Sequence, residues 1–142
     1  MSIALSLSTT LHTSFDDAVA RTRKALADEG FGVLTEIDVK ATLKSKLGAE
    51  MEDYLILGAC NPLLAHRAVT IDSQIGLLLP CNVVVRVDSA TEGTVIVEAI
   101  NPQMLIDLTG QPMLQEVAEQ ATGKLHAAID AVAATPTSPS AP

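Results

Sequence analysis

Aromatic side chains are nearly absent from this 142-residue chain: it has no tryptophan, and Phe, Tyr and Trp together make up 2% of it. Single-stranded nucleic acids are commonly held by stacking bases on aromatic rings, so that mode of binding is excluded. Hydrophobic residues nevertheless reach 48% of the chain. The core must therefore be filled with aliphatic side chains.

Basic residues are also scarce, with 9 Lys and Arg against 17 Asp and Glu and a formal net charge of −8. A chain of this charge repels a phosphate backbone, and we expect no nucleic-acid partner. The basic residues near 21–24 and 40–46 alternate with acids on short helical stretches. Such patterns are typical of solvated helix faces rather than binding patches.

Long apolar segments are missing as well, since no run of about 18 uncharged apolar residues occurs, and we expect no membrane partner. The first eight residues alternate apolar and small polar side chains, a pattern that predicts a strand rather than a signal peptide. These features favour a cytoplasmic location, where the two cysteines would be free thiols.

The domain organisation follows from length and composition. A chain of this size can build one compact core, and the patterned sequence extends over residues 1–134. Residues 135–142 consist of Pro, Ser, Thr and Ala without an apolar anchor. We therefore predict a single domain at 1–134 followed by a flexible tail at 135–142.

Hydrophobic periodicity predicts the secondary structure. Strands are expected at 2–11, 31–40, 54–59, 75–79, 83–87 and 94–100. Main helices are expected at 14–29 and after 110–112, and short helices at 41–47, 62–69 and 102–108. Together these elements indicate an α+β fold with a largely antiparallel sheet and two main helices on one face.

The patterns also assign side chains to sheet faces. One set of alternating residues is Phe31, Val33, Thr35, Ile37 and Val39, and the other is Gly32, Leu34, Glu36, Asp38 and Lys40. This spacing predicts a strand in which each set shares one face. The segment 54–59 is apolar at every position, which predicts a strand covered on both faces. Cys81 is expected on the same face as the alternate valines at 83–87. In the last helix, one stripe should cover the sheet, formed by Leu114, Val117, Ala118, Ala121, Leu125, Ala128, Ile129 and Val132.

Three segments carry a family resemblance. These are Glu29–Val39, the Leu-Gly-Ala-Cys-Asn-Pro sequence at 57–62, and the Leu-Pro-Cys-Asn sequence at 79–82 with its apolar flanks. Over residues 1–134 the chain resembles the bacterial and archaeal family named domain of unknown function 302. The resemblance implies a fold similar to that of the TATA-box-binding protein, in a family without an established activity. It does not imply DNA binding here, because the chain is acidic and lacks aromatic wedges.

The two cysteines occupy near-repeated settings, each where an apolar run meets a proline and an asparagine. This repetition makes both junctions candidates for one ligand-binding site, composed of Cys60, Asn61, Pro62, Pro80, Cys81 and Asn82. Cys60 should precede a helix N-terminus, whose partial positive charge favours a thiolate. The alternative is that both cysteines are small apolar residues that only fill the core.

A metal site is a further possibility, with Cys60, Cys81 and His66 as candidate ligands. The spacing of the cysteines is not that of a CxxC redox motif or a zinc knuckle, so it gives weak support. A lone helical histidine beside Arg67 is more typical of an exposed residue than of a ligand.

Three functions remain open. The first is a binding module for a small molecule or soft metal ion at the cysteine site. The second is a thiol redox enzyme or sensor that uses the same residues, and the third is a structural or partner-binding domain with inert cysteines. No phosphate loop, HExxH or GxSxG motif occurs, so an enzyme is not favoured, and the cofactor is unknown. A homodimer is expected because a small-residue sheet in so short a chain leaves an edge or face to cover.

Overall fold

The computed structural model describes residues 4–134 of the chain. Its strands are β1 (Ser6–Leu11), β2 (Gly32–Asp38), β3 (Tyr54–Cys60), β4 (Cys81–Val87) and β5 (Val95–Ile100). Its α-helices are α1 (Phe15–Asp28), α2 (Val39–Leu47), α3 (Pro62–Ile71), α4 (Met104–Thr109) and α5 (Gln115–Ala134). Two 3₁₀ helices, η1 (Ser73–Leu78) and η2 (Pro112–Leu114), precede β4 and α5. The predicted tail at 135–142 lies outside the described residues.

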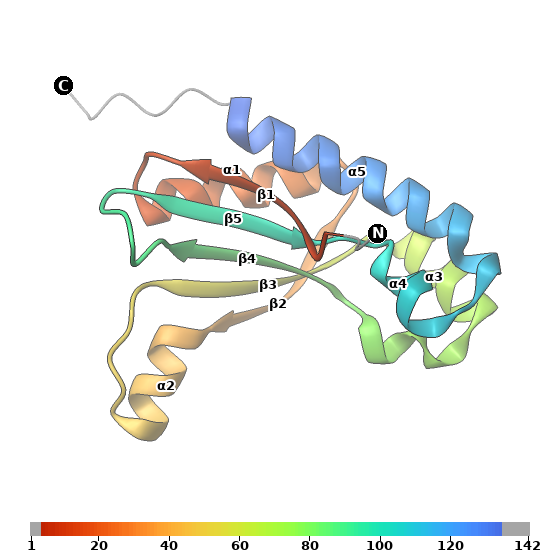
Figure 1. The fold of residues 1–142 in the computed structure, drawn as a ribbon, viewed down its shortest axis with the longest axis horizontal. Coiled ribbons are helices and arrows are strands. Elements are labelled where there is room, and N and C mark those ends of the chain that lie inside the picture. Colours follow the sequence, from red (N-terminus) through yellow and green to blue (C-terminus); the bar gives the residue numbers. More distant parts are fainter. Residues whose placement is uncertain (1–3, 135–142) are drawn as a thin grey trace.

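The five strands form one antiparallel sheet in the order β1-β5-β4-β3-β2. The predicted hairpin joins β4 to β5, and Val83 lies opposite Ala99. The strands cross the middle of the molecule, with α2 near one end and α3 and α4 near the other (Figure 1). The α+β fold with its antiparallel sheet is confirmed, whereas the likeness to the TATA-box-binding protein stays a prediction.

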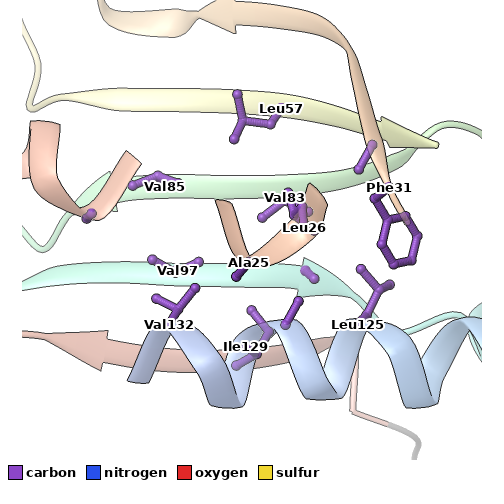
Figure 2. Close-up of a cluster of buried hydrophobic side chains, with 14 of the residues drawn as sticks. Ala25, Leu26, Phe31, Leu57, Val83, Val85, Val97, Leu125, Ile129 and Val132 are labelled. Atoms are coloured by element: carbon purple, nitrogen blue, oxygen red, sulfur yellow. The ribbon is translucent and has the colours of Figure 1, made fainter. Parts of the chain in front are cut away.

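One face of the sheet is covered by α1 and α5, the two main helices. Leu57, Val83, Val85 and Val97 point from the strands toward the side chains of these helices (Figure 2). All eight residues of the predicted stripe are buried. Its second half packs on the sheet as expected, whereas Leu114, Val117 and Ala121 pack in a second hydrophobic cluster, and Leu114 belongs to η2. Aliphatic packing of this kind supplies most of the favourable free energy of folding.

A second, smaller hydrophobic cluster lies beyond the ends of the strands. It joins α3, η1 and α4 to the first half of α5 through Leu64, Ala68, Ile75, Leu105, Leu114, Val117 and Ala121. In Figure 1, α5 begins beside α3 and α4 and then runs back along the sheet. The helix therefore contributes to both clusters, and Leu79 packs against both as well.

The structure corrects the expected strand at 75–79. Residues 75–78 belong instead to the 3₁₀ helix η1. The side chain of Asp72 accepts a hydrogen bond from the backbone N–H of Gln74 (3.0 Å), and its carbonyl accepts one from Ile75 (3.0 Å). A side-chain cap of this kind favours a helical turn over a strand. The apolar residues of η1 thus contribute to the second cluster instead of the sheet.

Two expectations for sheet faces are also wrong. The register of β2 shifts between Val33 and Thr35, so Val33 lies opposite Ala59 while Thr35 lies opposite Gly58. A bulge inserts one residue and moves the following side chains to the other face, so Thr35 and Ile37 do not share the face of Val33. In β3 the buried residues are Leu55 and 57–59, whereas Tyr54 and Ile56 remain half-buried on the face opposite α1 and α5.

The strand predicted at 31–40 is shorter than expected, because α2 begins at Val39. The side chain of Asp38 accepts a hydrogen bond from the N–H of Ala41 (2.9 Å) and caps this helix. At the other end Gly48 takes a left-handed conformation, with φ of 69°. Glycine adopts that conformation without the steric cost of a side chain.

Candidate functional site

A small cavity lies at the boundary between the two hydrophobic clusters. Its volume is about 40 Å³, and its walls come from β3, β4, α3, α4 and α5. Both cysteines line it, together with Asn61 and Pro80. The rest of the wall is apolar and includes Phe31, Leu64, Leu79, Leu105, Val117 and Ala121.

The sheet register brings the two cysteines to this place. Cys81, the first residue of β4, lies directly opposite Ala59 of β3, and Cys60 is the next residue of β3. Cα atoms of directly opposite residues in an antiparallel sheet are about 4.5–5.5 Å apart. Cys60 and Cys81 are therefore near neighbours across the end of the β3–β4 pair, and both are free thiols.

The two thiols differ in their surroundings. Cys81 is buried and Cys60 is half-buried. Burial raises the pKa of the Cys81 thiol to about 11, and the nearby negative charge that a Cys60 thiolate would carry adds to the shift. The Cys81 thiol is thus neutral at physiological pH unless a bound cation displaces its proton.

Asn61 links Cys60 to a helix end, as the sequence predicts. Its side-chain oxygen accepts a hydrogen bond from the N–H of Leu64 (3.2 Å), and its carbonyl accepts one from Ala65 (2.9 Å). Pro62 then opens α3, where its missing N–H costs nothing. Cys60 consequently lies immediately before the N-terminal end of a helix of 10 residues.

Not all of the predicted site residues line the cavity. Pro62 and His66 are exposed on α3, and the exposed side chain of Asn82 belongs to the opposite face of the sheet. Within residues 4–134, no three His, Cys, Asp or Glu side chains are grouped as metal ligands. The expected set of Cys60, Cys81 and His66 is therefore not assembled, since His66 lies on the solvent side of α3.

Sequence reasoning missed the apolar wall of the cavity. Val117 and Ala121 are on the predicted buried stripe, but the stripe does not indicate what they face. The position of Leu79 near Cys81 could have been inferred from the sequence, because only Pro80 separates the two residues in the Leu-Pro-Cys-Asn segment. Phe31 and Leu105 come from distant parts of the chain, and no local sequence feature indicated that they line the cavity.

Among the helices of residues 4–134, none combines the length and the apolar character needed to cross a membrane.

The comparisons with known proteins agree on one family. The sequence profile described as domain of unknown function 302 matches residues 7–132. No curated protein matches the chain. The crystal structure of an uncharacterised conserved protein of this family from Bacillus stearothermophilus superposes with a TM-score of 0.83 at 29% sequence identity, covering 92% of this chain and 99% of that one. The chain belongs to the family named domain of unknown function 302.

Proposed function

We propose that this protein is a binding module whose cavity between Cys60 and Cys81 holds a single soft metal ion or a ligand of comparable size. The observation that carries the proposal is that both cysteines of the chain line one small, mainly apolar cavity. Packing alone gives no reason for both cysteines of the chain to line the same cavity.

The size of the cavity limits the ligand. A volume of about 40 Å³ is close to the roughly 30 Å³ that one water molecule occupies in the liquid. Pockets for drug-sized molecules are about 300–1,000 Å³. A single ion or a ligand of very few atoms is therefore favoured over a metabolite.

The chemistry of the wall favours a soft monovalent cation. Thiolates select soft ions such as Cu(I), whereas Mg²⁺ and Ca²⁺ need several oxygen ligands. Structural zinc sites use four protein ligands, and the described residues offer no third His, Cys, Asp or Glu beside the cysteines. Two thiolates can hold Cu(I), and the N-terminal end of α3 beside Cys60 offsets part of their negative charge.

The test is a titration of the reduced protein with Cu(I) under anaerobic conditions, in competition with a chromophoric chelator. We expect one Cu(I) per chain, and weakening by about tenfold or more in Cys60→Ser and in Cys81→Ser. Met113→Ser is the matched control, because it removes an exposed sulfur from a residue that does not line the cavity. Failure to take up Cu(I), or uptake unchanged in both cysteine variants, would contradict the proposal.

The second candidate is thiol redox chemistry at the same residues, and the closeness of Cys60 and Cys81 across the β3–β4 pair supports it. In this reaction the two thiols lose two protons and two electrons to form a disulfide, while one oxidised glutathione is reduced to two glutathione thiols. Mass spectrometry after incubation with oxidised glutathione distinguishes the candidates. A reversible loss of two hydrogens favours redox chemistry. Unchanged thiols would argue against it and would leave metal binding and inert packing as the remaining explanations.

A further inference from the structure

The sheet has a second face that α1 and α5 do not cover. Cross-strand pairing puts Tyr54 opposite Arg86 and Arg86 opposite Ile96 on this face, and the next row contains Ile56, Val84 and Glu98. The apolar residues of this open face are Ile37, Tyr54, Ile56, Val84, Ile96 and Ile100. Ile37 is 48% exposed and the other five are half-buried. Within the described residues, the face is therefore apolar at its centre and open to solvent.

Charge on the open face differs from charge on the whole chain. At its paired strand positions the charged side chains are Arg86 and Glu98, whose Nε and Oε1 atoms are 2.8 Å apart. The remaining positions are uncharged Ser, Thr, Asn and Gly residues and Cys60 at the end of β3. The face thus has a net charge of zero in a chain whose net charge is −8.

We propose that the open face of the sheet is a homodimer interface, packed against the same face of a second copy of the chain. Two acidic chains repel each other over most of their surfaces, but not at a face where each copy carries one balanced ion pair. In a two-fold contact the same patch meets itself, so Arg86 and Glu98 of one copy can meet the opposite charges of the other.

The shape of the open face also fits a second copy. A hollow of about 260 Å³ is lined by Tyr54, Asn82, Val84, Glu98 and Ile100 and also by Leu5, which is 65% exposed. An exposed leucine beside a hollow on the same patch is self-complementary, because each copy can offer a side chain to the other's hollow.

The area of the open face indicates whether the proposed dimer interface is stable or transient. Five strands about 4.8 Å apart, each about six residues of 3.3 Å, give a face of roughly 480 Å². Two copies would bury about 1,000 Å² in total, which is below the roughly 1,200–2,000 Å² of stable interfaces and in the range of weak, transient ones. We therefore expect a reversible dimer whose population depends on protein concentration.

Sedimentation velocity of the full chain at about 1–200 µM tests the proposal, and we expect a concentration-dependent shift from monomer to dimer. Val84→Arg should be monomeric throughout this range. The matched control is Val69→Arg, which replaces a 45% exposed valine on α3 and should keep the dimer. Should Val84→Arg unfold by circular dichroism, Ile37→Arg takes its place, because that side chain is already exposed.

A charge exchange supplies an independent check. Arg86→Glu gives each copy two acidic residues on the face and should weaken the dimer by about tenfold or more. The double variant Arg86→Glu, Glu98→Arg restores neutrality and should regain most of the affinity. A wild-type chain that stays monomeric would overturn the proposal. A dimer that survives both Val84→Arg and Arg86→Glu would also overturn it, and would point to the edge strands β1 or β2.

Discussion

The ring of Pro80 lies against the backbone of Gly58 on the open face of the sheet. A Cβ atom at Gly58 would come within 2.8 Å of Cγ of Pro80 and would clash with the hydroxyl of Thr35. Gly58 thus permits the segment before β4 to lie close on β3, two residues before Cys60. A side chain missing from β3 thereby helps to position both cysteines of the cavity.

The first prediction concerns this contact. Gly58→Ala should lower the free energy of unfolding by about 1–3 kcal/mol, because the proline ring is rigid and overpacking forces the backbone to move. The control is Gly123→Ala in α5, where a Cβ meets nothing within 4 Å. That substitution should raise stability by about 0.5–1 kcal/mol through helix propensity. Urea unfolding measures both, and equal stability of the Gly58→Ala variant and wild type would contradict the close contact.

The second prediction is that Cys60 reacts faster than Cys81 with a thiol reagent at pH 7–8. Cys60 is half-buried beside the N-terminal end of α3, whereas burial keeps the Cys81 thiol neutral. The Cys81→Ser variant should therefore retain the fast phase seen with Ellman's reagent, and the Cys60→Ser variant should lose it. Similar rates in the two variants would remove this distinction between the thiols.

The third prediction is a loss of stability at alkaline pH that depends on Cys81. Its pKa is about 11 in the folded protein, against an ordinary value of 9.0. The folded state keeps the proton that the unfolded state releases, so the stabilisation is complete below pH 9 and is lost as pH rises toward 11. The linkage amounts to about 2–3 kcal/mol.

Other groups also titrate in that range, so the measurement is a comparison. The free energy of unfolding of wild type and of Cys81→Ala is followed by urea denaturation from pH 8 to pH 11. The decline should be shallower in the variant, because only wild type carries the buried thiol. Parallel pH profiles of the two proteins would refute the assignment to Cys81.

The fourth prediction concerns α5. Leu125 is fully buried between this helix and the sheet, near Phe31 (Figure 2). Leu125→Ala should cost about 2–5 kcal/mol, since burial is lost and a cavity is left. Leu63→Ala on α3 is the control, because that leucine is 68% exposed and should change stability by less than about 0.5 kcal/mol. A small effect at Leu125 would mean that α5 covers the sheet less tightly than described.

Local patterns were sufficient for most elements of this fold. The spacing along α5 identified its buried stripe, and the Asn-Pro pair at 61–62 identified the start of α3. These features depend on neighbouring residues, through helical periodicity and side-chain capping, and can therefore be inferred from sequence. The α+β class follows from them.

Only the tertiary structure decided how these segments combine. The bulge after Val33 and the 3₁₀ helix at Ser73–Leu78 override an apolar alternation that predicted regular strands. Phe31, Leu79, Leu105 and Val117 meet around the two cysteines because strand order and the path of α5 bring distant segments together. Periodicity determines which side of a helix or strand is buried, whereas long-range packing determines which residues that side contacts. The cavity depends on long-range packing, and for that reason only the tertiary structure reveals it.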